Sequence, residues 1–242
     1  MQSFKLPVLY RSELGTSPDL LLPPDMPRTT RPMGSVDVTW AEQRICFYVC
    51  HWTARLGGNA SEHRRGDLAR YLGTQIYDFL QEVQQPEQRH VVLMVDFNEP
   101  PYGLMEDRLY ALRDRASSRS PHRYTDKDTK RVRLYNSAWR HLGERLPHRP
   151  ETIVIPDAAG TYFWRQTNEW PTFDQILVSG TLLTDNAPYL IEAELGIVVH
   201  PLLFEEDGRP SSFRWNQGNP AGVSDHLPVH GVLQLSQEHH DA

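Results

Sequence analysis

Two continuous apolar runs separated by one amphipathic segment constrain the fold of this chain more than any other feature. The runs, residues 45–50 and 91–95, lack the polar alternation of a half-exposed strand. Between them, apolar residues recur at helical spacing behind Ser61, a residue type that favours helix starts. The apolar face of this segment comprises Leu68, Leu72, Ile76, Phe79 and Val83. The pattern predicts a buried strand, a helix and a second buried strand.

The same reasoning predicts two more helices and two more strands. One helix is predicted over Met105, Leu109, Leu112 and Ala116. Another is predicted over Tyr135, Ala138, Trp139, Leu142 and Leu146. Strands are predicted at residues 173–178 and 227–235, the second from alternating apolar positions.

The chain has the length and composition of one large globular domain, residues 1–242, of which 39% are hydrophobic. Residues 15–36 are rich in proline, threonine and serine and are predicted to form a loop. A mobile loop is predicted at residues 117–130 and a disordered tail at 236–242. No apolar stretch approaches the roughly 18 residues that span a bilayer, and a secretory leader pattern is absent, so we expect a cytoplasmic protein.

The two cysteines, Cys46 and Cys50, lie an even number of residues apart in one predicted strand. They therefore share a face of the sheet but are separated along the strand, which disfavours a disulfide. We expect both to be reduced thiols.

Four short motifs place acidic and imidazole side chains at the ends of predicted elements. They are HWTAR at 51–55, MVDFN at 94–98, TFDQILVS at 172–179 and GVSDHLP at 222–228. Each alone has a simpler interpretation, since an Asp-x-Asn after a strand is commonly just a turn. Together they supply what hydrolysis of a phosphate ester needs: a base for water, carboxylates for a cation, and donors for phosphoryl oxygens.

The order of these motifs resembles the endonuclease/exonuclease/phosphatase superfamily, which includes DNase I, AP endonucleases, sphingomyelinases and inositol polyphosphate phosphatases. The resemblance extends from about residue 40 to the end, and segments 134–139 and 160–164 are similar to segments of bacterial members. It implies an α/β (α+β) fold, a DNase I-like four-layer sandwich of two mixed β-sheets flanked by helices.

The resemblance also implies catalytic roles. His226 is expected to be the general base toward water, with Asp174 accepting a hydrogen bond from its far ring nitrogen. His51 is expected to donate to a non-bridging phosphoryl oxygen or to assist the leaving group. Asp96 and Asn98, two residues apart, are expected to position the nucleophile and to contact the phosphate or a metal.

The implied cofactor is Mg²⁺ or Mn²⁺, since both favour carboxylate oxygens. Asp225 and Asp96 are the expected metal ligands. Asn98 and Arg55 are the expected substrate-binding residues, although a surface role is the simpler interpretation of Arg55.

The sequence departs from the family pattern in its first part. The family's opening strand ending in asparagine and the strand that carries a metal-binding glutamate have no counterpart, so an N-terminally incomplete domain is expected. Glu13 and Glu42 are weak substitutes, because neither has the family's QE context. Val95 stands where the family has glycine. A truncated start, a partner or residue that completes the site, and a pseudoenzyme remain open.

Charge distribution bears on the substrate. Residues 108–149 hold twelve Lys and Arg against four Asp and Glu, in a chain of net charge −6. This cationic segment indicates a surface for phosphate backbones or for an acidic partner. It favours a nucleic acid, DNA in particular, and hence a nuclease. A solvated helix face is an equally good interpretation. A phosphatase acting on a small or lipid phosphate is favoured if the segment lies far from His226, and the absent glutamate favours an inactive binding or regulatory subunit.

Overall fold

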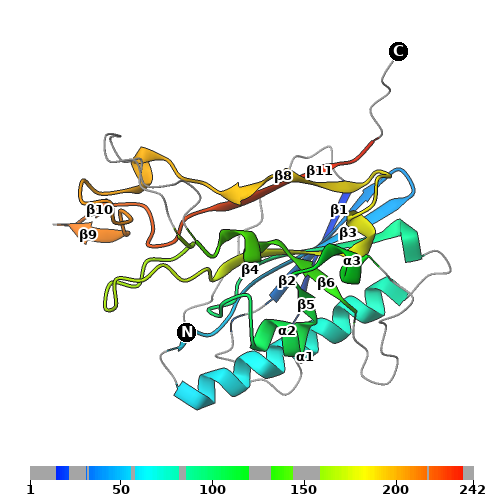
Figure 1. Ribbon diagram of the computed structural model, residues 1–242, viewed down its shortest axis with the longest axis horizontal. Helices are drawn as coiled ribbons and strands as arrows, with labels where there is room; N and C mark the ends of the chain where they lie inside the picture. Colours follow the sequence, from blue (N-terminus) through cyan, green and yellow to red (C-terminus); the bar gives the residue numbers. More distant parts are fainter. Residues whose placement is uncertain are drawn as a thin grey trace, which may run out of the picture.

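The larger of two β-sheets that pack face to face is mixed and has the strand order β1-β2-β3-β4-β7-β6-β5 (Figure 1). This arrangement comes from a computed structural model that describes residues 15–21, 31, 33–55, 58–81, 86–119, 132–143, 159–216 and 218–236. The second sheet pairs β8 with β11, and a separate hairpin pairs β9 with β10. No helix in the described ranges is long and apolar enough to cross a membrane.

The larger sheet consists of β1 (Gly15–Leu21), β2 (Met33–Trp40), β3 (Gln43–His51), β4 (Arg89–Asp96), β5 (Ala111–Leu112), β6 (Leu134–Asn136) and β7 (Asp174–Ser179). The other strands are β8 (Tyr189–Ile197), β9 (Arg214–Asn216), β10 (Asn219–Ala221) and β11 (Val229–Gln234). The helices are α1 (Gly58–Gln81), α2 (Leu104–Leu109) and α3 (Arg115–Ser118). Short 3₁₀ turns are η2 (Pro86–Gln88), η3 (Ser137–His141), η4 (Gly180–Leu182) and η5 (Pro201–Leu203).

The predicted strand, helix and strand are confirmed as β3, α1 and β4. β3 and β4 are parallel neighbours, and α1 connects them across one face of the sheet. The helix buries Leu68, Leu72 and Ile76 against that face. Cys46 and Cys50 point to the same face and are free thiols, as predicted.

The opposite face of the larger sheet packs against β8 and β11. Ile45, Val92 and Ile176 from the larger sheet form a core with Leu190 and its neighbours on the second sheet. The strands predicted at 173–178 and 227–235 correspond to β7 and β11. The α/β fold class with two sheets is confirmed, and the described residues form three layers: α-helices, the larger sheet and the β8–β11 sheet.

The prediction of a loop at residues 15–36 is wrong for residues 15–21 and 33–36, which form strands. β1 and the start of β2 occupy these positions, paired antiparallel in continuous register from Gly15 with Thr39 to Leu21 with Met33. β1 is an edge strand, where Pro18 is tolerated because one side of the strand needs no ladder hydrogen bond. Composition is therefore a poor guide to this segment.

Both of the later helix predictions are also wrong in part. The segment around Met105 to Ala116 is interrupted after α2, where Tyr110 has a φ of 56°, and Ala111 and Leu112 form β5. The segment from Tyr135 to Leu146 begins as strand β6 and continues as the short turn η3. In each case pairing with a neighbouring strand overrides helical periodicity.

Three smaller predictions concern the start of a helix, a loop and the C-terminal tail. Ser61 lies inside α1, which starts at Gly58, so Ser61 is not its cap. Ser117 and Ser118 of the predicted mobile loop belong to α3, and residues 120–130 lie outside the described ranges. The predicted tail lies outside them as well, apart from Ser236.

Candidate active site

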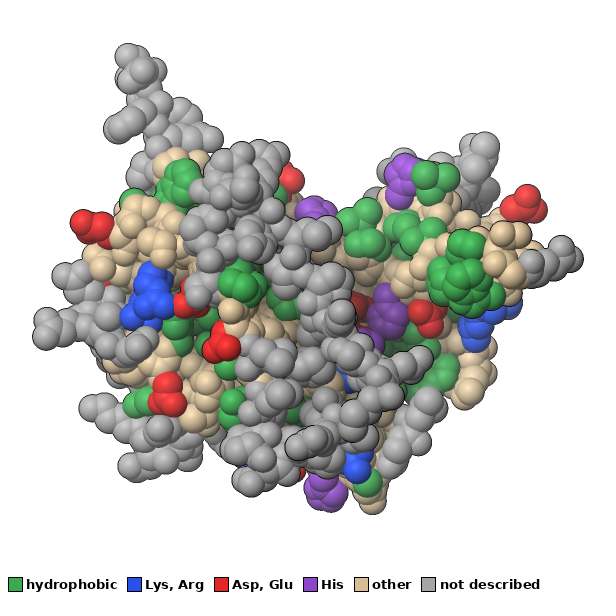
Figure 2. Space-filling model, turned by 180° about the vertical axis from the view of Figure 1, so that it is seen from behind, with side chains coloured by type: hydrophobic (Ala, Val, Ile, Leu, Met, Phe, Trp, Pro, Cys, Tyr) green, Lys and Arg blue, Asp and Glu red, His purple; other side chains and the backbone are tan. Residues whose placement is uncertain are grey.

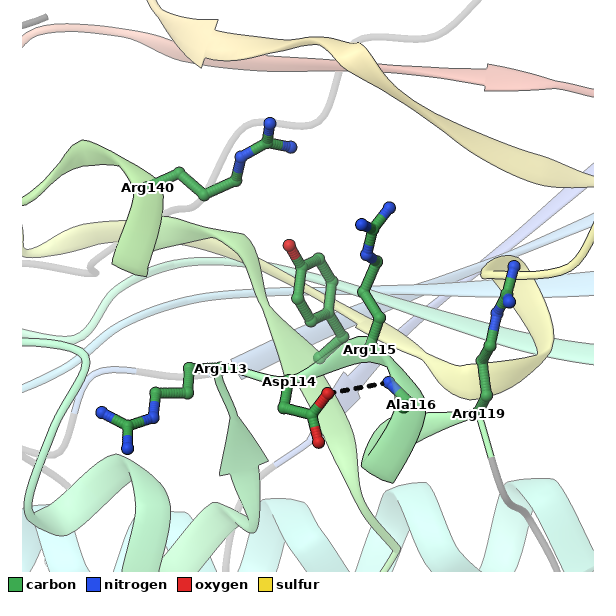
Figure 3. Close-up of a pocket in the computed structure, with 7 residues that line it drawn as sticks. Arg113, Asp114, Arg115, Ala116, Arg119 and Arg140 are labelled. Carbon is green, nitrogen blue, oxygen red and sulfur yellow. Dashed lines mark hydrogen bonds between the residues drawn. The ribbon is translucent and has the colours of Figure 1, made fainter.

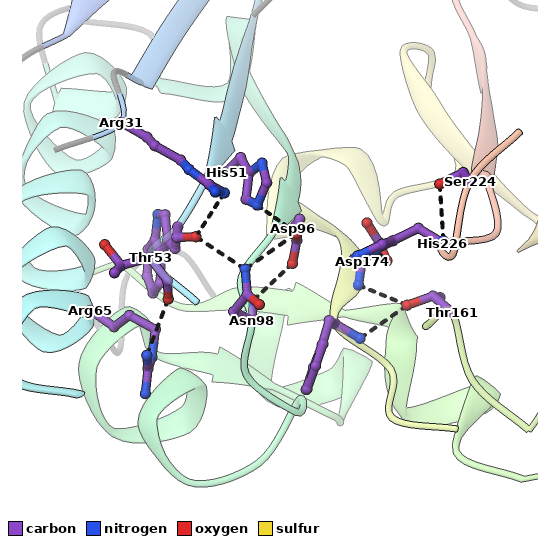
Figure 4. Close-up of polar contacts among 12 residues, drawn as sticks. Arg31, His51, Thr53, Arg65, Asp96, Asn98, Thr161, Asp174, Ser224 and His226 are labelled. Carbon is purple, nitrogen blue, oxygen red and sulfur yellow. Dashed lines mark hydrogen bonds and ion pairs between the residues drawn. The ribbon is translucent and has the colours of Figure 1, made fainter. Parts of the chain in front are cut away.

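Strand register brings three of the predicted site residues to one edge of the larger sheet. His51 pairs with Asp96 across the parallel β3–β4 ladder, and Asp96 pairs with Asp174 across the antiparallel β4–β7 ladder. Side chains directly opposite each other on neighbouring strands lie within contact of one another. The site is therefore built on the ends of three adjacent strands (Figure 4).

His226 approaches these strand ends from the segment that leads into β11. Its Nδ1 lies 2.8 Å from Asp174 Oδ2, and its ring lies 4.6 Å from the ring of Tyr162. The Ser224 hydroxyl accepts a hydrogen bond from the His226 backbone N–H at 3.0 Å. Because the contact with Asp174 uses Nδ1, Nε2 of His226 remains to accept a proton, as a general base requires.

A second histidine–aspartate pair lies beside the first. His51 Nε2 is 3.0 Å from Asp96 Oδ2. The backbone N–H of Asn98 donates to Asp96 Oδ1 at 2.9 Å, and the Asn98 side-chain amide donates to the Trp52 carbonyl and to Asp96 Oδ2. Asn98 has a φ of 51°, a conformation that asparagine tolerates better than most residues. In this geometry Asn98 orients Asp96.

Burial and charge shift the pKa values of this cluster in different directions. Burial raises the pKa of Asp174, against the opposing effect of its hydrogen bond with His226. For Asp96, burial is outweighed by the hydrogen bond with His51, the charges of both histidines and the Asn98 N–H, so its pKa is lowered. Burial would lower the pKa of His226, but the hydrogen bond with Asp174 and the charges of three aspartates raise it.

The cluster also fits a divalent cation. Single ligand atoms of Asp96, Asp174 and His226 all lie within 4.8 Å of one another. Two like charges on opposed strand positions repel, so a cation between them would offset that cost. Two carboxylates with several waters are a common ligand set for Mg²⁺ in proteins.

Other predicted residues lie outside this cluster. Asp225 is exposed, although its charge acts on His226 and on Tyr162. Arg55, four residues after His51, is also exposed. Glu42 lies in the turn that precedes β3, at the opposite end of that strand from His51, and so does not replace the absent glutamate. Glu13 falls outside the described residues.

Comparison with known proteins identifies the family of this chain. The profile of the endonuclease/exonuclease/phosphatase family matches residues 7–135, more than half of the sequence. The chain belongs to this family. No curated protein matches the sequence.

Several solved structures are distantly similar to this chain. A family protein from Bacteroides thetaiotaomicron is 13% identical with a TM-score of 0.42, and the match covers 82% of this chain and 54% of that one. D. rerio TDP2 complexed with a single-stranded DNA product is 14% identical with a TM-score of 0.45, covering 90% and 67%. The human Nocturnin catalytic domain with bound sulfate is 13% identical with a TM-score of 0.36, covering 91% and 60%. This chain spans about half to two thirds of the length of these structures.

Residues that the motifs did not single out hold the site in place. Arg65 of α1 is 3% exposed and contacts Glu99 at 2.7 Å through two of its nitrogens. The same guanidinium donates to the Thr53 carbonyl at 3.1 Å, and a contact with the Ala54 carbonyl is longer at 3.5 Å. Thr53 and Ala54 follow His51 by two and three residues, and Glu99 directly follows Asn98. Arg65 therefore ties together the two loops that leave β3 and β4.

Thr161 links the other half of the site. Its side chain is fully buried, and its hydroxyl oxygen accepts hydrogen bonds from the backbone N–H groups of Phe173 and Asp174 at 3.0 and 2.9 Å. Its carbonyl accepts from the Leu227 N–H at 2.7 Å. Thr161 thus fixes the strand end that carries Asp174 beside the segment that carries His226.

The backbone ahead of His226 requires glycine. Gly222 has a φ of +72°, and a Cβ there would lie 2.1 Å from the Ser212 carbonyl oxygen. Gly222→Ala is therefore expected to destabilise the fold by about 1 kcal/mol or more and to displace His226. Thermal unfolding and activity of the variant test this, with Gly208→Ala, a positive-φ glycine in open space, as the control for backbone strain alone. An unchanged activity in Gly222→Ala would show that the close approach does not position His226.

Proposed function

We propose that this protein is a divalent-metal-dependent phosphoesterase, and that its substrate is a nucleic acid, DNA in particular. The observation that carries the proposal is the pairing of His226 with Asp174 at the strand end that faces Asp96 and His51. Figure 2 shows histidine and acidic side chains exposed beside a hollow in the rim of the molecule, on the face opposite that of Figure 1.

Hydrolysis follows from the two histidine–aspartate pairs. His226 Nε2 takes a proton from water as the water oxygen bonds to phosphorus, while Asp174 holds the ring and stabilises the imidazolium. His51 donates a hydrogen bond to a phosphoryl oxygen, or a proton to the departing alkoxide as the bond from phosphorus to that oxygen breaks. Asp96, inside the cluster, and Asp225, exposed beside His226, are the proposed ligands of Mg²⁺ or Mn²⁺, while Asp174 remains the partner of His226. The cation would neutralise charge developing on the phosphoryl oxygens.

The proposal gives a defined pH dependence. Because the pKa of His226 is raised above the usual 6.5, the neutral base is lost as pH falls through that raised value. We therefore expect kcat/KM to fall on the acid side with an apparent pKa above 6.5, measured as a pH–rate profile at constant ionic strength. A rate that holds steady down to pH values well below 6.5 would contradict the role of His226 as base.

A phosphoesterase acting on a small or lipid phosphate is the second candidate. Arg115 of α3 and Arg119 at its end do not line the cluster of Asp96, Asp174 and His226, here called the His226 cluster. Ser118 of the same helix packs against Gly180, beyond the end of β7 that is opposite to Asp174. The β9–β10 hairpin that leads into Gly222 also exposes Phe213 and Trp215, side chains suited to a lipid surface.

A substrate panel tests these candidates. The protein is incubated with Mg²⁺ or Mn²⁺ and supercoiled plasmid, single-stranded DNA, p-nitrophenyl phosphate or phosphoinositide vesicles. We expect cleavage of DNA that depends on the metal. Turnover of the monoester or lipid alone would replace the nuclease with the second candidate, and no turnover of any substrate would favour a binding or regulatory subunit.

A further inference from the structure

A cavity lined by arginines lies between the edge of the larger sheet and β8 (Figure 3). Its volume is about 710 Å³, and Arg113, Arg115, Arg119 and Arg140 line it together with Tyr135. These residues come from α3, from η3 and from the strands β5 and β6 or the turns beside them. Several elements therefore bring positive charge to one pocket, here called the arginine pocket.

Among the described residues, three carboxylates near the arginine pocket, Asp114, Asp185 and Glu192, face its four arginines and leave it with a surplus of positive charge. Asp185 is exposed and lies 3.8 Å from Arg119. Asp114 also lines the pocket but caps α3, accepting hydrogen bonds from the N–H groups of Ala116 and Ser117. Glu192 of β8 forms ion pairs with Arg115 and with Arg140, the latter at 3.8 Å. Burial and the proximity of Glu192 raise the pKa of Tyr135 to about 12, so its hydroxyl remains a donor. The Glu192 carboxylate is thus shared by two guanidinium groups.

One end of the arginine pocket, at α3, lies far from the His226 cluster, and the other end, at η3, lies near it. At its far end, α3 packs so closely on Gly180 that a Cβ there would lie 2.0 Å from the Ser118 carbonyl oxygen. Ser179, next to Gly180, is five residues from Asp174 along β7, which is roughly 17 Å. At the near end, the His141 carbonyl of η3 accepts a hydrogen bond at 3.1 Å from Thr172, two residues before Asp174.

We propose that the arginine pocket binds backbone phosphates of a polynucleotide strand, outside the phosphodiester that is hydrolysed. This inference rests on the proposed function and names its substrate class. Guanidinium groups bind phosphate oxygens through paired donors, and several of them in one pocket match a ligand with repeating phosphates. At 3.4 Å per nucleotide in a duplex strand, the roughly 17 Å from the His226 cluster to the far end of the pocket corresponds to about five nucleotides.

The test compares two double variants by fluorescence anisotropy with a labelled single-stranded oligonucleotide. Arg115→Gln with Arg140→Gln removes two pocket charges, and Arg70→Gln with Arg209→Gln removes two charges elsewhere. The four side chains are 61%, 56%, 57% and 53% exposed, so the pairs are matched in exposure and charge. We expect the pocket variant to raise Kd about tenfold or more, and its salt dependence to weaken by about 0.7 for each phosphate that the protein no longer neutralises. An equal rise in Kd in the control variant would overturn the assignment of phosphate binding to the arginine pocket.

Glu192→Gln provides a change of opposite sign. It removes the carboxylate that competes with phosphate for Arg115 and Arg140, so the oligonucleotide is expected to bind more tightly. This result also guards against a loss of binding caused merely by misfolding of the arginine variant. Unchanged or weaker binding in Glu192→Gln would overturn the assignment.

Catalytic measurements separate this inference from the proposed function. With bis(p-nitrophenyl) phosphate, which is too small to reach both sites, the pocket variant is expected to keep the kcat and KM of the unchanged protein, while KM for the oligonucleotide rises. If the pocket binds inorganic pyrophosphate but no oligonucleotide, its ligand is a compact phosphate compound, and the assignment of a polynucleotide is overturned. Oligonucleotide binding that depends on the pocket, in a protein that hydrolyses no phosphate ester, would support the pocket and reject catalysis.

Discussion

Asp174→Asn is expected to lower kcat for phosphate ester hydrolysis by about 10²–10⁴. Asp174 accepts the hydrogen bond from Nδ1 of His226, which keeps Nε2 free to take the proton from water. An asparagine at this position can donate to Nδ1, which would leave the proton on Nε2, and it cannot stabilise the imidazolium. The rate with a soluble phosphodiester under saturating metal measures the effect.

A second readout distinguishes loss of this orienting role from general damage. The hydrogen bond with Asp174 and its charge raise the pKa of His226, so the acid limb of the pH–rate profile is expected to move to lower pH in Asp174→Asn. Asp67→Asn, an exposed carboxylate of α1, serves as the control and should change neither the rate nor the profile. A full rate in Asp174→Asn would contradict the paired roles of Asp174 and His226.

Arg65→Ala is expected to reduce the free energy of unfolding by about 3–5 kcal/mol. The substitution leaves the Glu99 carboxylate buried without its cation and removes donors from the Thr53 carbonyl and the Ser61 hydroxyl. Burying an unpaired charge is one of the few changes that destabilise a protein this strongly. Chemical denaturation with the unfolding slope fixed measures the loss.

Two variants sharpen this prediction. Arg70→Ala removes an exposed arginine of the same helix that pairs with Asp67, and it should cost less than about 1 kcal/mol. Arg65→Met combined with Glu99→Leu removes both charges and should be more stable than Arg65→Ala alone. If Arg65→Ala and Arg70→Ala cost the same, the buried pair does not hold the two site loops.

The site residues that could be predicted from the sequence lie at the ends of buried strands. Asp96 and Asp174 stand where apolar runs end or begin, and parallel and antiparallel pairing then brings such residues to one edge. Arg65 carries a usable signal that the motifs do not include, because it precedes Leu68 by three residues and Leu72 by seven and so lies on the apolar face of α1. Thr161 lies in segment 160–164, which resembles the family, but its role was not predicted, since that role depends on contacts with residues more than ten positions away.

The errors in the fold have a common physical cause. The proline and serine content of residues 15–21 predicts a loop, yet an edge strand tolerates both residue types. Leu109 and Leu112 are at helical spacing, but the left-handed turn at Tyr110 and the pairing of Ala111 with Leu134 end the helix. Strand pairing between distant segments is not encoded in a local window, so it outweighs local periodicity there.

The most direct test of the central claim is hydrolysis of bis(p-nitrophenyl) phosphate by the unchanged protein and by His226→Ala, each with Mn²⁺ and with a chelator. We expect turnover that requires the metal and that falls by about 10²–10⁴ in His226→Ala, with the thermal stability of the variant close to that of the unchanged protein. Equal turnover in His226→Ala, or turnover that persists in chelator, would contradict a metal-dependent phosphoesterase with His226 as its base.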